Sequence, residues 1–474
     1  MKQSPPFLLF FTIITLFTFV KCSDKESKIE PISGQVVDAY NQDPVENVRV
    51  QLLENGPVTF TDANGNFQFS AADLGSQDFE VVLNGADLGA ALSLSSSGYR
   101  PRESNVFYDE KAIIKFTRDS VPSYVYYPPV QLNDGIETAD MSTIGMDRQI
   151  IQNLMDKMYA FKYKQVHSLL VYKDDHLVME EYFYGNNDTI QFENNITRDR
   201  NPEHIFWTRT TEHYVASVNK ALTGTIVGIA LNEKGLPVNT KIAAYLPEYA
   251  SHFDDANKAE IAFEDCLTMT AGLSWDEWGK DDLSLLWKSD DFAKFALSRA
   301  GYGPGFEWRY NSALPNILLK AVTNIVDAPV RDWAQEHFYG KLGIEDYKWQ
   351  SQPDGFPEGA ARMYIRPRDM LKVGVTYLNG GKWNGEQVIP ASWVQECFKV
   401  KEETTSGDYS YYFWLRSLNG VNYLSADGDG GNYINIFPDQ NMVIVITQGN
   451  YLEWPGYVNQ ADEIMKNHIF EAIK

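Results

Sequence analysis

A serine and a lysine three residues apart, Ser217 and Lys220, form the only Ser-x-x-Lys pattern in the chain, within YVASVNKALTGTIVGIAL. In a helix that begins at the serine, the two side chains share one face, with Cβ atoms about 5 to 6 Å apart. The helix dipole would help keep the amine neutral and would stabilise an oxyanion at the serine. A neutral amine can take the seryl proton, so the spacing predicts Ser217 as a nucleophile and Lys220 as its base. A capping serine followed by a solvated lysine would give the same four-residue pattern.

The segments around this pattern carry a family resemblance. ASVNKALTGTIVGIAL is followed by LPEY at 246–249 and by FEDCLTMTAGLSWDE at 263–277. In this order and spacing, they resemble the penicillin-binding and class C β-lactamase-like serine hydrolases, and the resemblance covers roughly residues 150–474. It implies an α/β (α+β) fold: an antiparallel sheet flanked by helices, with an all-helical subdomain.

Two further motifs of that family have counterparts here. GFEWRYNSALPNILL supplies Tyr310 and, two residues later, Ser312, where the resemblance implies a proton-shuttling phenol and a substrate-binding side chain. LSADGDGGNYINIFP aligns with the motif on the strand beside the cleft. There Gly428 would let a substrate backbone approach closely, and the amide of Asp429 would join that of Ser217 as the oxyanion hole.

The chain departs from the family pattern at two positions. Ser312 stands where asparagine is common, which resembles esterases and 6-aminohexanoate-dimer hydrolases more than β-lactamases. Ala426 replaces a cation that would bind a carboxylate, so β-lactams and D-Ala-D-Ala peptides are poorly matched substrates. Asp427 and Asp429 either give the cleft a negative charge suited to an amine or neutral substrate, or point away and cap the glycine turn; we favour the second interpretation.

Other conspicuous residues have a structural interpretation as well. His167 and His213 are expected to be packed histidines, because a lysine already serves as the base. In IRPRDMLKVG, the residues Arg366, Arg368 and Asp369 are expected to form structural ion pairs. Three tryptophans fit either an acyl pocket or core packing: Trp275, Trp278 and Trp308.

The pattern of expected strands and helices divides the chain into a small β-sandwich, a linker and a larger domain. Residues 33–118 contain short strands such as SGQVVDA, NVRVQLLE and NFQFS, and resemble a carboxypeptidase-regulatory-like β-sandwich. The turn at 61–66 has the Asp, Asn and Gly of a hairpin. Residues 119–148 are expected to be an ordered linker, and 149–474 the hydrolase domain. We expect a helix at 147–161, then a strand pair turning at 173–175, and a final pair, YINIFP and MVIVITQ, turning at 439–441.

The N-terminus predicts export. An uncharged run from Phe7 to Val20 is too short to span a bilayer but suits a signal peptide. It ends at Lys21 and Cys22, which resembles a bacterial lipoprotein signal at residues 1–22 with Cys22 as the lipidated residue. An ordinary cleaved signal peptide is the alternative. The predicted location is a lipid-anchored outer-membrane or periplasmic protein, with the lipid as its membrane contact.

Composition excludes several partners. The formal charge of −23 and the pI near 4.7 leave no basic stripe for nucleic acid. The remaining cysteines, Cys266 and Cys397, are too few for a disulfide framework and are expected to be buried thiols. No metal-ligand spacing is visible, and the proposed chemistry needs no cofactor.

The sequence therefore predicts an exported serine hydrolase that forms a seryl acyl-enzyme with a small ester or amide. Two alternatives stay open. One is an amidase or carboxypeptidase acting on D-amino-acid peptides or peptidoglycan. The other is a cell-surface protein that binds glycan or peptide without catalysis.

Overall fold

The computed structural model describes residues 32–38, 43–52, 56–70, 72–73, 90–97, 99, 102–106, 112–116, 124–159, 162–192, 196–198, 202–279 and 281–473. The predicted lipoprotein signal and Cys22 lie outside these residues. Within the described part, no helix is both long enough and apolar enough to cross a membrane.

The N-terminal unit is built of seven strands in two sheets, with the orders β4-β1-β7 and β3-β2-β5-β6. The strands are β1 (Ile32–Asp38), β2 (Arg49–Leu52), β3 (Val58–Phe60), β4 (Asn66–Phe69), β5 (Ala90–Ser95), β6 (Arg102–Val106) and β7 (Ala112–Phe116). Apolar side chains from both sheets, among them Val36, Val50 and Phe69, form a core of their own. The strands expected from the sequence are therefore present.

The turn at residues 61–66 is not the predicted hairpin. It joins β3 to β4, which belong to different sheets. The turn chemistry is nonetheless as expected: Asp62 accepts the amides of Asn64 and Asn66, and Gly65 has a φ of +73°. Asp, Asn and Gly favour a reversal of the chain, and the sequence of a tight turn does not decide whether the next strand pairs with the previous one.

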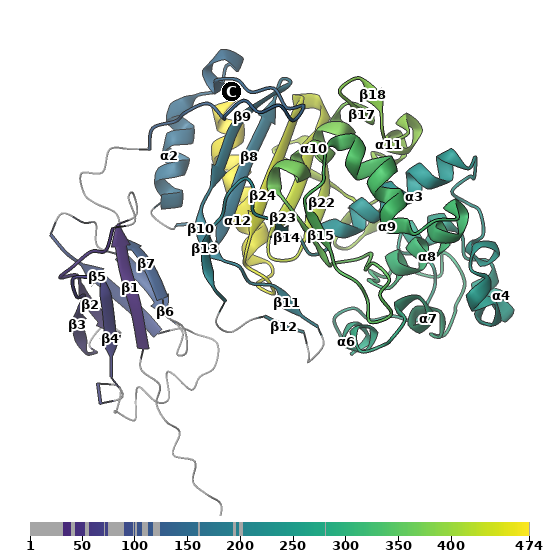
Figure 1. Cartoon of the computed structure of the whole chain (residues 1–474), viewed down its shortest axis with the longest axis horizontal. Helices are drawn as coiled ribbons and strands as arrows, with labels where there is room; N and C mark the ends of the chain where they lie inside the picture. Colours follow the sequence, from purple (N-terminus) through teal and green to yellow (C-terminus); the bar gives the residue numbers. More distant parts are fainter. Residues whose placement is uncertain are drawn as a thin grey trace, which may run out of the picture.

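The hydrolase unit is centred on an eight-stranded antiparallel sheet with the order β19-β20-β21-β22-β23-β24-β8-β9 (Figure 1). Its strands are β8 (Val166–Lys173), β9 (His176–Tyr182), β19 (Glu402–Thr404), β20 (Gly407–Tyr409), β21 (Trp414–Leu418), β22 (Val421–Gly428), β23 (Asn432–Phe437) and β24 (Met442–Gln448). The predicted pairs β8–β9 and β23–β24 are confirmed, with Asp174 and Asp175 in the left-handed conformation at the first turn. Because β24 also pairs with β8, the two ends of this unit meet in one sheet.

Helices cover both faces of this sheet (Figure 1). One face packs against α2 (Arg148–Tyr159), α12 (Gly456–Ile464), η7 (Met465–Ile469) and α13 (Phe470–Ala472) around buried residues such as Leu154, Ile444 and Ile464. The other face packs against α3 (Val218–Glu233) and α10 (Pro367–Leu378). Gly374 of α10 lies against Val443 and Ile434, where a Cβ atom would come within 2.6 and 2.8 Å of their side chains.

The predicted helical subdomain extends beyond α3. Its helices are α4 (Ala256–Ala259), α5 (Phe263–Leu267), α6 (Asp282–Trp287), α7 (Phe292–Leu297), α8 (Leu314–Val326) and α9 (Val330–Ala334), with the short helices η2 (Ile242–Tyr245), η3 (Pro247–Asp254), η4 (Gln335–Tyr339) and η5 (Gly340–Leu342). Further short elements are η1 (Met141–Ile144), η6 (Pro438–Gln440), α11 (Ala391–Cys397), β10 (Tyr184–Asn186), β11 (Ile190–Gln191), β12 (Thr197–Arg198), β13 (His204–Phe206), β14 (His213–Tyr214), β15 (Tyr347–Trp349), β16 (Met363–Ile365), β17 (Lys382–Trp383) and β18 (Glu386–Gln387). One continuous apolar core joins α3, α8 and α10 to the sheet.

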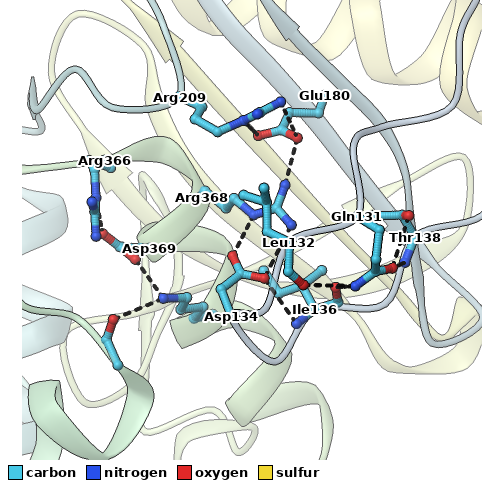
Figure 2. A network of polar contacts seen from close by, with 12 residues as sticks. Gln131, Leu132, Asp134, Ile136, Thr138, Glu180, Arg209, Arg366, Arg368 and Asp369 are labelled. Atoms are coloured by element: carbon cyan, nitrogen blue, oxygen red, sulfur yellow. Dashed lines mark hydrogen bonds and ion pairs between the residues drawn. The ribbon is translucent and has the colours of Figure 1, made fainter.

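An ion-pair network ties the segment before α2 to the hydrolase unit (Figure 2). Arg368, on α10, donates to Asp134 at 2.6 and 3.2 Å and to Glu180 of β9 at 2.6 Å. Arg366 pairs with Asp369, as expected from the sequence. Burial by itself raises the pKa of Asp134, but the hydrogen bond and charge of Arg368 outweigh it and lower that pKa. The predicted linker is thus anchored on α10.

Replacing Arg368 with alanine is expected to lower the free energy of unfolding by about 3 to 5 kcal/mol, because it leaves the fully buried carboxylate of Glu180 without its main partner. The matched control is Arg148→Ala, which breaks the more exposed pair with Asp140 and should lower the free energy of unfolding far less. Urea unfolding followed by tryptophan fluorescence measures both. Equal losses in the two variants would show that the buried network stabilises the fold no more than the exposed pair does.

Candidate active site

Ser217 lies at the N-terminus of α3, as predicted. It is the cap residue of this helix, with φ −67° and ψ −6°. The residue before it, Ala216, has a φ of +45°, a conformation that is rare outside glycine. Such strain is concentrated at functional sites. The amide of Val218 donates to the carbonyl of Val215 at 3.2 Å, and this hydrogen bond closes the turn that presents the serine.

Lys220 meets Ser217 one helical turn later. Its Nζ lies 2.9 Å from the seryl Oγ, and its side chain is almost completely buried. The amine also donates to the carbonyl of Ala360 at 3.3 Å. The sequence prediction that these two groups touch is confirmed in geometry, and the hydroxyl is placed to give its proton to the amine.

The segment 358–362 holds α3 in this position. Asn219 donates to the carbonyl of Glu358 at 2.9 Å, and Thr223 donates to that of Gly359 at 2.7 Å. The Glu358 carboxylate is buried and accepts the amides of Ala360, Ala361 and Arg362 at 2.6 to 2.9 Å. Glu358 therefore fixes the carbonyl to which Lys220 bonds, a role that the sequence analysis missed.

Tyr310 lies beside Lys220 in the loop before α8. The amine is 4.8 Å from the centroid of the phenol ring, so the contact is with the ring face. The ring is stacked on that of Trp414, with 6.4 Å between the ring centroids, and it lies near Trp308 and Tyr409. These aromatic neighbours position the tyrosine at the site, as predicted.

Ser312 is bonded to a buried glutamate that the sequence analysis did not identify. The hydroxyl and amide of Ser312 both donate to Glu277, the amide at 3.1 Å. Trp275 donates its indole N–H to the same carboxylate at 2.6 Å. The predicted substrate-binding serine therefore acts first as a partner of Glu277, although both residues line the pocket at Ser217.

Burial raises the pKa of Glu277, while the charge of Lys220 and the bonds from Ser312 and Trp275 lower it in part. A carboxyl with a raised pKa beside the amine of an active site is a recognised functional signal. The motif LSWDE contains no feature that distinguishes Glu277 from the neighbouring acid, Asp276, because its role arises from contacts with a distant part of the chain.

Gly428 lies at the end of β22, directly against the turn that carries the serine. A Cβ atom at this position would be 2.2 Å from the Val215 carbonyl oxygen. The structure thus shows a close approach of the chain itself at this glycine, and the approach of a substrate backbone here stays a prediction. The amides of Ser217 and Asp429 flank this contact, and neither donates to another group in the described part of the chain.

The two aspartates on this strand do not place free charges in the cleft. Asp427 pairs with Arg416 and accepts the hydroxyl of Ser425. Asp429 accepts the amide of Leu452 at 2.7 Å and the hydroxyl of Tyr457 at 2.8 Å. The favoured interpretation, that these side chains are used structurally, is confirmed.

A largely apolar pocket opens at the nucleophile. About 400 Å³ of space there is free of protein atoms, and this space includes open solvent at the mouth of the pocket. Its apolar lining consists of Ile190, Phe192, Ile196, Trp278, Leu283, Trp287 and Leu452. The rings of Phe192 and Trp287 are stacked, with 4.7 Å between their centroids. Of the three tryptophans considered from the sequence, Trp278 lines this pocket, whereas Trp275 is buried beside Glu277 and Trp308 packs near Tyr310.

The histidines and thiols are structural, as expected. His167 and His213 are buried and bond to each other at 2.8 Å, and the ring of His167 stacks on Trp207. Burial lowers the pKa of both, that of His213 to about 3. Cys266 and Cys397 are buried free thiols, and burial raises the pKa of each.

Comparisons with known proteins agree with this geometry. A family model described as Beta-lactamase matches residues 149–459. A 6-aminohexanoate-dimer hydrolase of Paenarthrobacter ureafaciens is 24% identical over 260 residues, which cover 49% of this chain and 65% of that enzyme. The chain thus spans just under two thirds of that relative.

Solved structures share the fold. One is described as a 6-aminohexanoate-dimer hydrolase from Bacillus anthracis, with a TM-score of 0.53, 18% identity, and coverage of 68% of this chain and 82% of that one. A family VIII carboxylesterase has a TM-score of 0.51 and 16% identity, covering 66% and 95%. Because the family model covers more than half of the 474 residues, the chain belongs to the beta-lactamase family of serine hydrolases.

Proposed function

We propose that this enzyme cleaves small esters or amides with an apolar acyl group, through an acyl-enzyme on Ser217. The observation that carries the proposal is the 2.9 Å contact between the Ser217 hydroxyl and the buried amine of Lys220. A seryl hydroxyl needs such a base to become nucleophilic at neutral pH.

The reaction runs in two halves. Ser217 Oγ attacks the substrate carbonyl carbon while its proton passes to Lys220, and the amides of Ser217 and Asp429 bind the oxyanion. As the bond to the leaving group breaks, Lys220 returns the proton to that group through Tyr310. Water then attacks the acyl carbon of the acyl-enzyme and gives a proton to the amine of Lys220. As the bond to Ser217 Oγ breaks, Lys220 returns this proton to the serine and the acid product leaves.

The pocket favours a neutral, apolar acyl group. Its wall offers aromatic and aliphatic side chains, such as Phe192, Trp287 and Leu452. Ala426 supplies no cation for a substrate carboxylate, and Asp427 and Asp429 are already bonded within the protein. Relatives that bear the names of an amide hydrolase and of a carboxylesterase support both bond types.

The test is labelling with a fluorophosphonate, which reacts with an activated serine. The wild-type chain should be labelled, and Ser217→Ala should not. The control Ser289→Ala removes the hydroxyl of a partly buried serine that bonds to the Leu286 carbonyl, and labelling should remain. Equal labelling of all three proteins, or of none, would refute the acyl-enzyme and favour a binding protein without catalysis.

We further propose that the enzyme is exported and lipid-anchored through Cys22. Support comes from the uncharged run Phe7 to Val20 directly before Lys21 and Cys22. In a bacterial host, an alkyne fatty acid should label the wild-type protein, and Cys22→Ser should lose both the label and the membrane fraction. Cys397→Ser is the control and should keep both. A wild-type protein without label would point to an ordinary signal peptide, and label retained by Cys22→Ser would place the lipid on another residue.

A further inference from the structure

A second cavity lies on the face of the sheet opposite to α3. It is a trough between α12 and strands β20 to β23, with about 860 Å³ of space free of protein atoms. Side chains alternate along β22, so Leu424, Ala426 and Gly428 share the face toward α3, while Ser425 and Asp427 face the trough. The trough is therefore separated from the Ser217 pocket by the strand itself.

Carboxyl groups outnumber basic groups in this trough. Asp408, Asp427 and Asp462 line it, and Arg416 is the basic residue among the lining side chains. Arg416 is held by Asp427, so its charge is already matched. The carboxylate of Asp462 forms no hydrogen bond or ion pair within the described part of the chain, and burial raises its pKa, which the charge of Arg416 partly offsets. A partly buried carboxyl without a partner suits a ligand that brings a positive charge.

A tyrosine hydroxyl in the trough is also without a partner. Tyr433 is 5% exposed, and its hydroxyl makes no hydrogen bond among the described residues. It is paired across the strands with Asp427, so both side chains lie on the trough face. A buried hydroxyl normally has a partner, and an orphan of this kind indicates an unfilled position for a polar group.

The rest of the lining decides what kind of cation fits. Within the described residues, no group of three His, Cys, Asp or Glu side chains is arranged to hold a metal ion. Apolar side chains complete the walls: Leu415, Leu418, Val458, Ala461 and Met465. Such a lining suits a ligand with a hydrocarbon part and one charged end.

We propose that this trough is a binding site for a short aliphatic amine in its protonated form, with the ammonium group between Asp462 and the Tyr433 hydroxyl and the carbon chain along α12. The ammonium donates to the Asp462 carboxylate and to the phenol oxygen, and the methylene groups contact Leu418 and Val458. The site is independent of the proposed hydrolysis, because none of its residues lines the pocket at Ser217.

The test is isothermal titration calorimetry of the full chain with n-pentylamine, which has one ammonium group at neutral pH. The wild type should bind, and Asp462→Asn should weaken binding by about tenfold, the effect of losing roughly one charge-assisted contact. Tyr433→Phe should weaken it severalfold. The uncharged isostere 1-pentanol should not bind.

Three controls locate the site. Asp439→Asn changes an exposed aspartate in the turn between β23 and β24 and should leave the affinity unchanged. Ser217→Ala should also bind normally, whether or not the protein is a hydrolase. Circular dichroism checks that Asp462→Asn is folded. No binding at n-pentylamine concentrations up to about 50 mM, equal affinity in Asp462→Asn, or equal binding of 1-pentanol would each overturn the proposal.

Discussion

Lys220→Met is expected to lower kcat/KM for an activated ester by about 10² to 10⁴, the usual contribution of a positioned general base. The substitution removes the amine but keeps most of the volume of the buried stem, so the helix around it can stay packed. The Ser217 hydroxyl then loses the amine that lies 2.9 Å from it. Hydrolysis of p-nitrophenyl butyrate across pH 6 to 9 is the measurement.

The residual rate should come from substrate binding and the oxyanion amides, which remain in place. Lys234→Met is the matched control, because this lysine follows the last turn of the same helix and is far more exposed. Its kcat/KM should equal that of the wild type. Activity of Lys220→Met within tenfold of the wild type would show that another group takes the seryl proton.

The parts of the site that sequence could predict are local. Ser217 and Lys220 are one helical turn apart, so their contact follows from the geometry of a single helix. The strand pair β23–β24 follows in the same way from two apolar runs joined by a short turn. Each inference needs a few neighbouring residues, and each is confirmed.

The parts that were missed depend on distant contacts. Glu277 is defined by its bonds to Ser312, in a different element, and Glu358 by the backbone loop that it holds against α3. In sequence, each is one acidic residue among many in an acidic chain. The hairpin prediction for the turn at 61–66 was wrong for the same reason, since hairpins and crossings between two sheets share the same local turn chemistry.

Gly428→Ala is expected to reduce kcat/KM by about 10² or more without any change to the nucleophile or base, because misplacing reacting groups by about 1 Å can have that effect. The added Cβ atom would lie 2.2 Å from the Val215 carbonyl oxygen, so one of the two backbones must move. Strand β22 is held by its pairing with β23, in which Gly428 faces Asn432.

The turn from Val215 to Ser217 is therefore the backbone that must move. That turn already contains Ala216 at positive φ and is closed by the bond from the Val218 amide to the Val215 carbonyl. Shifting the carbonyl displaces the seryl hydroxyl relative to Lys220, and it separates the Ser217 amide from that of Asp429. Both effects act on the transition state, so the loss should appear mainly in kcat.

Gly456→Ala is the matched control, since a Cβ atom at that position, the start of α12, meets nothing within 4 Å. Steady-state kinetics, the rate of fluorophosphonate labelling and the melting temperature should be measured on both variants. Overpacking should also cost Gly428→Ala about 1 to 3 kcal/mol of stability. A folded Gly428→Ala protein that is labelled at the wild-type rate would mean that the strand yields instead of the turn, and that the position of Ser217 does not depend on this contact.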